Sequence, residues 1–303
     1  MSRAHSHSQP VVSIEYFPPS GLSAERALIT GAHALRRFAP DYQTITFGAG
    51  GASSDSVRDV ALEWSSQLQN LNEVPTACHL ALCHFESSEV LFDFATNLKE
   101  EGIERLVVLR GDAQSSSGNG LAGHNSVADA VRALKKKFGF DISVAAYPEP
   151  HPKAQSSAAD IQVLLDKQAA GANRAITQYF FDNELFYDFC DKARAAGVKM
   201  DIVPGIMPIA NFEKIKEFSE KCGASVPERF EALFAKAGDD KAARSDVARE
   251  LVETQVRDLA RNGVDQLHIY SLNRVDLTAD AIRAFQAEFE GGSVTKFVPA
   301  IAS

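Results

Sequence analysis

Short runs of β-branched and aliphatic residues alternate with longer segments of helical periodicity along almost the whole chain. Uninterrupted apolar runs are typical of strands that are buried on both faces, as in a parallel sheet. We predict eight such strands, at residues 11–17, 42–48, 75–82, 105–110, 141–146, 174–180, 200–206 and 266–272. The segments between them have the apolar spacing of helices, and we expect helices near residues 21–38, 54–68, 87–99, 156–171, 183–196, 210–221, 227–237, 243–262 and 278–290, with another that ends at residue 138.

The stretch from residue 141 to residue 181 shows the repeating unit most clearly. A buried-strand run leads into a proline-rich turn, and a helix follows with Ser156 or Ser157 as its N-cap. Gly171 ends this helix, and a second buried-strand run completes a strand–helix–strand unit with parallel strands. The segment therefore predicts an α/β protein with helices on the outside of a parallel sheet.

The spacing of the units predicts the architecture. Strand starts recur roughly 30 residues apart, the length of one unit, and only the last interval is about twice as long. A (β/α)8 TIM barrel with extra helices between strands seven and eight fits this spacing, and a doubly wound open sheet is the competing architecture. We expect a disordered arm at residues 1–10, the barrel at residues 11–290 and a tail at residues 291–303.

Composition narrows the class of protein. The chain has 303 residues, of which 45% are hydrophobic and 23% charged, and its net charge is −9. Without a basic cluster interleaved with aromatic residues, nucleic acid is not an expected partner, and no apolar run is long enough for a membrane helix. The N-terminal residues lack the apolar core of a secretion signal, so we expect a cytoplasmic protein with reduced thiols at its four cysteines. No metal-binding motif is present, and no metal site is predicted.

Polar residues collect where the predicted strands end, and in a barrel these ends share one rim. The set comprises Glu15, Thr46, His79, Arg110, Gly111, Asp112, Tyr147, Gln178, Gly205, Asn273 and Arg274, with His84 just beyond strand three and Phe212 soon after strand seven. Any one of them could be a polar core residue with satisfied hydrogen bonds, but their recurrence at so many strand ends favours a ligand site. On the helix after strand five, Asp160 and Lys167 share a face and are candidates to hold the ribose and phosphate of a ligand.

Glu15 carries the most specific chemistry. Strand alternation places it on the same face as Ser13, while apolar and aromatic residues surround it in the sequence. Burial of a carboxyl group raises its pKa, and a protonated carboxyl group is what a general acid requires. We therefore expect a raised pKa at Glu15, and a second carboxylate in a different environment at Asp112.

These segments resemble methylenetetrahydrofolate reductase of the bacterial single-domain type, from about residue 12 to residue 276. The resemblance is carried by IEYFPP (14–19), TITFGAGG (44–51), CHLALC (78–83), LVVLRGD (106–112), DISVAAYPEPHP (141–152), GANRAITQYFFD (171–182), VPGIMPIANF (203–212) and HIYSLNR (268–274). It implies a (β/α)8 barrel that binds FAD at the strand carboxyl ends. It also implies hydride transfer from NADH or NADPH through FAD to the small-molecule substrate 5,10-methylenetetrahydrofolate, with ping-pong kinetics and 5-methyltetrahydrofolate as product. A homo-oligomer is expected as well.

The resemblance also implies roles for individual residues. Glu15 would be the general acid, and Asp112 would tune the flavin and position the folate. Contacts to FAD would come from Thr46, His79, Arg110, Gly111, Asp112, Tyr147, His151, Asp160 and Lys167, and contacts to folate or nicotinamide from Gln178, Phe212 and Arg274. Preference for NADH or NADPH is left open.

The chain departs from the family pattern in two places. Residues 123–126 read Gly-His-Asn-Ser where relatives carry a tyrosine-containing segment that touches FAD, and Val163 and Asp166 replace a polar residue and an arginine. A carboxylate in place of a cation predicts weaker FAD retention than is usual in the family. Two alternatives are a flavin-free barrel that acts on a one-carbon carrier, such as a methyl-transfer or demethylation enzyme, and a non-catalytic flavin- or folate-binding protein.

Overall fold

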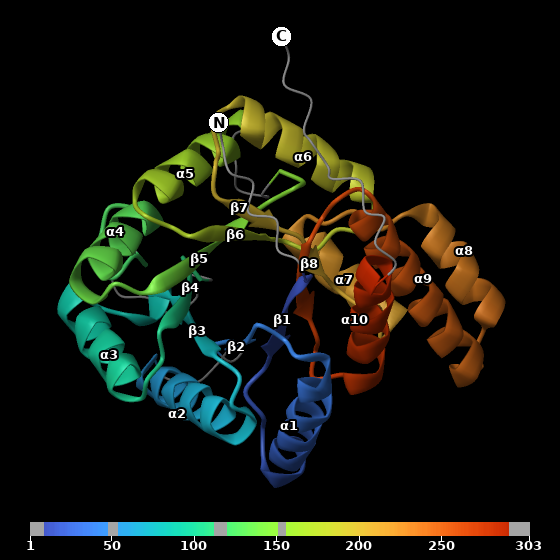
Figure 1. Ribbon diagram of the computed structural model, residues 1–303, viewed down its shortest axis with the longest axis horizontal. Helices are drawn as coiled ribbons and strands as arrows, with labels where there is room; N and C mark the ends of the chain where they lie inside the picture. The colour runs from blue at the N-terminus through green and yellow to red at the C-terminus, as the bar shows by residue number, and fades with distance from the viewer. Residues whose placement is uncertain (1–8, 48–53, 112–119, 151–155, 291–303) are drawn as a thin grey trace.

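The computed structural model describes residues 9–47, 54–111, 120–150 and 156–290. Within these ranges, every strand pairing is parallel, in the order β7-β6-β5-β4-β3-β2-β1-β9-β8. The strands are β1 (Val11–Tyr16), β2 (Tyr42–Ile45), β3 (Thr76–Ala81), β4 (Arg105–Leu109), β5 (Asp141–Ala146), β6 (Arg174–Thr177), β7 (Asp201–Val203), β8 (Gly205–Ile206) and β9 (Gln266–Tyr270). Figure 1 shows them as a ring enclosed by helices.

The ring closes through a divided strand. The stretch predicted as a seventh strand at 200–206 is split by Pro204 into β7, which pairs with β6, and β8, which pairs with β9. Proline has no backbone N–H to donate to a ladder, which accounts for the break. The Pro204 carbonyl still accepts a hydrogen bond from the His268 N–H at 3.0 Å, a distance typical of a ladder bond. The two short strands together take one place in an eight-membered ring, so the (β/α)8 prediction is confirmed and the open doubly wound sheet is wrong.

Helices cover the outside of the ring, in the positions that the periodicity predicted. They are α1 (Leu22–Leu35), α2 (Ser54–Asn72), α3 (Ser88–Glu100), α4 (Val127–Phe138), α5 (Ser157–Ala169), α6 (Asn183–Ala195), α7 (Phe212–Cys222), α8 (Glu228–Ala237), α9 (Lys241–Arg261) and α10 (Val275–Glu290). The extra helices lie between β8 and β9, and Figure 1 shows α8 outside α9. The Ser156 side chain caps α5 by accepting from the Ala159 N–H, as the sequence indicated.

Strand alternation divides the core into two layers. Val12, Ile14 and Tyr16 of β1 point outward and pack with the helices in the large hydrophobic cluster. The inside of the barrel holds a small apolar cluster that includes Tyr42 and Val107. Glu15 lies on this inner face, with a side chain only 8% exposed. In the described part of the chain, no helix has the length and apolar character needed to cross a membrane.

Candidate active site at the carboxyl end of the barrel

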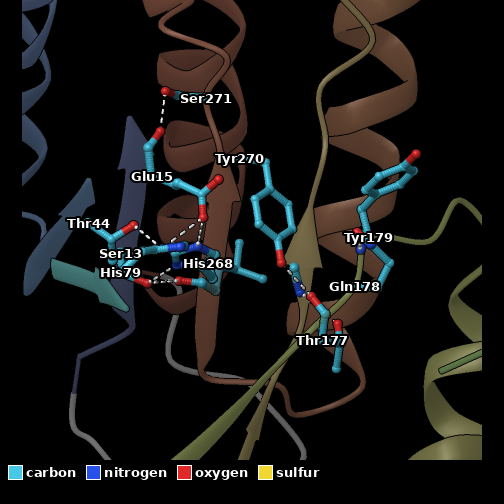
Figure 2. A network of polar contacts seen from close by, with 12 residues as sticks. Ser13, Glu15, Thr44, His79, Thr177, Gln178, Tyr179, His268, Tyr270 and Ser271 are labelled. Carbon is cyan, nitrogen blue, oxygen red and sulfur yellow. Dashed lines mark hydrogen bonds and ion pairs between the residues drawn. The ribbon is translucent and has the colours of Figure 1, made fainter. Parts of the chain in front are cut away.

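A buried carboxylate flanked by two imidazoles occupies the barrel interior near the ends of β1, β3 and β9 (Figure 2). One oxygen of Glu15 lies 3.2 Å from His79 Nε2 and 3.4 Å from His268 Nε2. The second ring nitrogen of His268 is also engaged, because His268 Nδ1 lies 2.8 Å from the Ser13 hydroxyl. His79 Nε2 is 3.2 Å from the Thr44 hydroxyl. Four parallel strands therefore contribute polar side chains to one connected network.

The expected raised pKa at Glu15 is wrong. Burial does raise the pKa, but the charge of His79 and hydrogen bonds from His268 and His79 outweigh it and bring the pKa to about 2. Sequence reasoning included the apolar neighbours of Glu15 along its own strand and not the imidazoles that reach it from β3 and β9. Glu15 is consequently a carboxylate at neutral pH in this structure.

Burial lowers the pKa of His268, and Glu15 opposes this shift. A neutral His268 ring can donate from Nε2 to the Glu15 carboxylate and accept from the Ser13 hydroxyl at Nδ1, an arrangement that satisfies all three groups. The network therefore holds the Glu15 carboxylate in one orientation.

Tyr270 forms the boundary between this network and the ends of β6 and β8. Its hydroxyl donates to the Thr177 carbonyl at 2.8 Å, and its ring lies edge-on to His268 at 5.0 Å. Burial raises the pKa of Tyr270 well above its usual value, and the nearby Glu15 charge adds to the effect. A Cβ at Gly205 would lie 2.5 Å from this ring and 2.2 Å from the Thr177 carbonyl, so only glycine fits there.

Two residues at the rim have features of a cofactor cradle. Thr46 is 9% exposed, and its Oγ1 is buried without a hydrogen-bond partner among the described residues. Gly111 has a φ of +80°, and a Cβ there would lie 2.4 Å from Cys83 Sγ. The unsatisfied hydroxyl of Thr46 is available to a bound ligand, whereas glycine is required at position 111 because Cys83 and Ala81 fill the space that a Cβ would need.

The predicted FAD-contacting residues that remain lie on several elements, and not all of them are at the rim. The Arg110 side chain is exposed and has no ion-pair partner in the described part of the chain. Tyr147 follows β5 and is half-buried. Lys167 lies on the inward face of α5, only 8% exposed, and its Nζ donates to the Ala145 carbonyl at 2.8 Å. Burial lowers the pKa of Lys167 to about 8, and Asp160 on the same helix opposes the shift.

The predicted substrate-binding residues are less closely grouped. Gln178 follows β6 and uses its Oε1 to accept from the Tyr179 N–H at 3.0 Å. Arg274 is exposed on the turn after β9. Phe212 is 6% exposed and stacks on Phe234 with ring centroids 4.7 Å apart, inside a hydrophobic cluster between the rim and α8. Asp112 and His151 lie outside the described residues.

Sequence reasoning missed the partners of Glu15. Ser13 was placed on the correct face by alternation, but no role was inferred for it, and His268, Thr44 and Tyr270 were not selected. Strand alternation could have identified these partners, because it predicts which positions of β1, β2, β3 and β9 point into the barrel, and several of those positions carry polar side chains. No group of histidine, cysteine or acidic side chains in the described ranges has the geometry to hold a metal ion.

The comparisons with known proteins fit this site. The family model for methylenetetrahydrofolate reductase matches residues 1–285. The chain belongs to the methylenetetrahydrofolate reductase family. It is 36% identical over 267 residues to the 5,10-methylenetetrahydrofolate reductase of Pectobacterium carotovorum, covering 88% of this chain and 87% of the relative. The Escherichia coli reductase is 35% identical over 277 residues and is covered, like this chain, over 91% of its length.

More distant proteins share part of the sequence or the fold alone. A protein from rice named as a probable methylenetetrahydrofolate reductase (NADH) is 31% identical over 90% of this chain, which spans 48% of the rice protein. Among solved structures, an uncharacterized Clostridium thermocellum protein that binds two copies of 5-methyl-5,6,7,8-tetrahydrofolic acid superposes with a TM-score of 0.60. At 14% identity over 93% of this chain and 95% of that one, the likeness shows the shared fold alone. Family membership supports oxidoreductase chemistry on methylenetetrahydrofolate in one-carbon metabolism.

Proposed function

We propose that this reductase transfers hydride from NADH or NADPH to FAD and then from FAD to 5,10-methylenetetrahydrofolate, giving 5-methyltetrahydrofolate in a ping-pong cycle. Residues 11–290 would form the FAD-binding catalytic barrel. The single observation that carries the proposal is the Glu15 carboxylate, buried at the barrel mouth between two imidazoles in a member of this family. The plant relative named for NADH supports a nicotinamide co-substrate.

The rim fits a flavin. Thr46 offers an unsatisfied hydroxyl, and Lys167 offers an ammonium group for a phosphate. Gly111, which packs against Cys83, would contribute backbone groups alone. His79, Arg110, Tyr147 and Asp160 complete the described part of the proposed binding surface. When bound, FAD supplies the hydride-carrying chemistry, and the protein supplies orientation, protons and charge.

Asp166 works against FAD retention. It is exposed on α5, next in sequence to Lys167, and accepts a hydrogen bond from Gln162 at 3.0 Å. A carboxylate near a bound pyrophosphate repels it. We therefore expect this protein to retain FAD less tightly than relatives with an arginine at that position.

Opening the methylene bridge of the substrate requires a proton at the bridging amine nitrogen. We assign its delivery to Glu15. The low pKa of this carboxyl group makes it a carboxylate in the free protein, so Glu15 must take up a proton before it can act as the acid. His79 Nε2, 3.2 Å away, is close enough to resupply Glu15 directly. Ser13 and Thr44 hold the two rings in the orientation that this transfer needs.

Substrate recognition is assigned to residues on the β6 and β9 side of the mouth. Gln178 has amide hydrogens for a pterin ring, and the exposed Arg274 suits the carboxylates of folate. Phe212 contacts a ligand only if its ring leaves Phe234, so its role implies a movement at the start of α7.

Glu15→Gln separates the two half-reactions. We expect flavin reduction by NADH to stay near the wild-type rate, and reoxidation by methylenetetrahydrofolate to slow about 10²- to 10⁴-fold, the range for loss of a general acid. Anaerobic stopped-flow absorbance of the flavin measures both steps, and Glu217→Gln on the exposed face of α7 is the control. Equal slowing of the two steps would remove Glu15 from this role.

The same experiment tests the alternatives. A yellow protein whose flavin absorbance is bleached by NADH or NADPH fits the reductase, and a colourless protein that does not bind added FAD fits a flavin-free one-carbon enzyme. Comparing the two nucleotides in the first step gives the coenzyme preference. A cytoplasmic location and a homo-oligomer stay predictions, testable by cell fractionation and by light scattering.

A further inference from the structure

The turn that follows β9 is bonded to the end of β1, the strand that carries Glu15. The Asn273 side chain pairs with both backbone groups of Phe17: its Oδ1 accepts from the Phe17 N–H at 2.9 Å, and its Nδ2 donates to the Phe17 carbonyl at 3.0 Å. The Ser271 hydroxyl donates to the Glu15 carbonyl and accepts from the Asn273 N–H. Side chains of the turn thus satisfy the backbone of β1 just beyond the last strand pair, Glu15 with Tyr270.

The backbone of this turn adopts a conformation that is uncommon for its residues. Leu272 has a φ of 48° and Asn273 a φ of 55°, and neither is glycine. Asparagine tolerates the left-handed region, whereas a leucine there is unusual. Strained backbone of this kind persists where surrounding contacts hold it, and it clusters at functional sites.

The turn also holds the backbone of Arg274, the proposed folate-binding residue. The Arg274 N–H donates to the Ser271 carbonyl at 2.7 Å, and the Arg274 carbonyl accepts from the Thr278 hydroxyl at 2.6 Å. Glu15 and Arg274 are 259 positions apart in the numbering of the sequence, yet Ser271 bonds to the backbone of both.

We infer that Asn273 is a positioning residue, which fixes the end of β1 so that the Glu15 carboxylate stays between His79 and His268 while Arg274 faces the folate. The inference rests on the proposed function, and it adds a residue that does not itself contact the reacting atoms. The inference depends on how close the Phe17 hydrogen bonds are to the catalytic carboxylate. The bonds at Phe17 act two residues from Glu15, and a displacement of about 1 Å at a reacting group costs roughly 10²-fold in rate.

Two substitutions at Asn273 test the hydrogen bonds to Phe17. Asn273→Gly keeps the positive φ without strain but removes both bonds to Phe17. Asn273→Asp keeps an acceptor for the Phe17 N–H but replaces the donor to the Phe17 carbonyl with a carboxylate oxygen, which repels that carbonyl. Asn262→Gly is the matched control, because Asn262 also bonds to a backbone carbonyl, that of Asp258, but lies at the opposite end of the barrel, before β9.

The measurements are hydrogen exchange of the Phe17 amide by NMR and the two flavin half-reactions by stopped flow, all on the full chain with FAD. For Asn273→Gly we expect exchange at least about tenfold faster, folate-dependent reoxidation slowed roughly 10²-fold, and flavin reduction by NADH changed by less than about twofold. Asn273→Asp should slow the folate step at least as much, because two acceptors then face each other at the Phe17 carbonyl, and Asn262→Gly should match the wild type.

Three outcomes would overturn the inference: an unchanged folate step in Asn273→Gly despite faster exchange at Phe17, equal loss in both half-reactions, or the same loss in Asn262→Gly. Failure of the proposed function is distinguishable, because the wild-type protein would then lack the folate step altogether. Loss of the folate step alone in the Asn273 variants, with Asn262→Gly unchanged, supports the positioning role.

Discussion

At the scale of single residues, hydroxyl groups on one strand illustrate how position decides what a polar atom does. Thr44 lies within β2, and Thr46 is the first residue after this strand ends. The Thr44 hydroxyl lies 3.2 Å from His79, whereas the Thr46 hydroxyl is buried without a partner in the described ranges. A buried polar group without a partner costs about 1–3 kcal/mol, so Thr46 is maintained at the expense of stability.

Thr46→Val tests whether that hydroxyl serves a ligand. We expect the FAD-free protein to gain roughly 1 kcal/mol of unfolding free energy, and FAD affinity to fall about fivefold to tenfold through the lost hydrogen bond. Thermal unfolding without FAD and flavin fluorescence titration measure the two effects. Thr44→Val is the matched comparison and should lower stability, since it removes a partner of His79. A Thr46→Val protein that is less stable and binds FAD normally would contradict the assignment.

At the scale of elements, α5 presents opposite charges to different surroundings. Lys167 points inward to the Ala145 carbonyl, whereas Asp166 and the 48%-exposed Val163 face outward. Burial lowers the pKa of Lys167 to about 8, so the ammonium form is destabilised in the absence of a ligand anion. One helix thereby combines a buried ammonium group, which we propose as a phosphate ligand, with an exposed carboxylate next to it in the sequence.

Lys167→Met should therefore change both FAD binding and its pH dependence. In the wild type, we expect FAD affinity to fall as pH rises through about 8, because Lys167 then loses its proton. In Lys167→Met, affinity is lower throughout, and this step is absent. Titrations between pH 6.5 and 9.5, followed by flavin fluorescence, measure the difference.

The sign of the stability effect follows from the same shift. The lowered pKa means that the unfolded chain binds more protons than the folded one between about pH 8 and pH 10.5, so wild-type stability rises with pH in that range. Lys167→Met removes a buried charge and should therefore raise the free energy of unfolding. This gain should be largest near pH 7 and shrink above pH 8. Asp166→Arg is the contrasting variant, expected to tighten FAD without this pH step. A wild-type titration that is flat through pH 8 would rule out Lys167 as the phosphate ligand.

At the scale of the whole molecule, the two ends of the barrel have separate tasks. The carboxyl end holds the Glu15 network, and the amino end is closed by an ionic cluster at the start of β5. Asp141 accepts from Arg174 at 2.7 and 2.9 Å and lies 3.0 Å from Arg105, while both guanidinium groups stack over the Tyr42 ring. In barrels of this type, chemistry is located at the carboxyl end and stability at the amino end.

Asp141→Asn should reduce stability and leave catalysis intact. The two arginines lose a carboxylate partner, and the Arg174 pair is partly buried, so we expect a loss of roughly 1–3 kcal/mol in unfolding free energy. Urea unfolding and steady-state kcat measure the two quantities. Asp129→Asn, which breaks the exposed pair with Arg132 on α4, should change neither appreciably. A large fall in kcat for Asp141→Asn would show that the two ends are coupled.

Much of the fold was predictable because its signals are local. Apolar runs identified the strands, helical periodicity identified the helices, and the repeat of the two indicated a closed barrel. Ser156 and Gly171 indicated the ends of α5 for the same reason, since caps depend on neighbours a few residues away. The division of strand seven was also visible as Pro204, although its effect on the pairing was not foreseen.

The sequence alone determined which strands bring polar side chains to one rim, because alternation and strand order follow from short-range pattern. Only the tertiary structure decided how Glu15 ionises and what holds it in place. His268 lies 253 residues from Glu15 in the chain, yet its ring reaches the carboxylate at 3.4 Å. Electrostatic interaction depends on distance in space, so no reading of neighbours along β1 reveals a pKa that is set by β3 and β9.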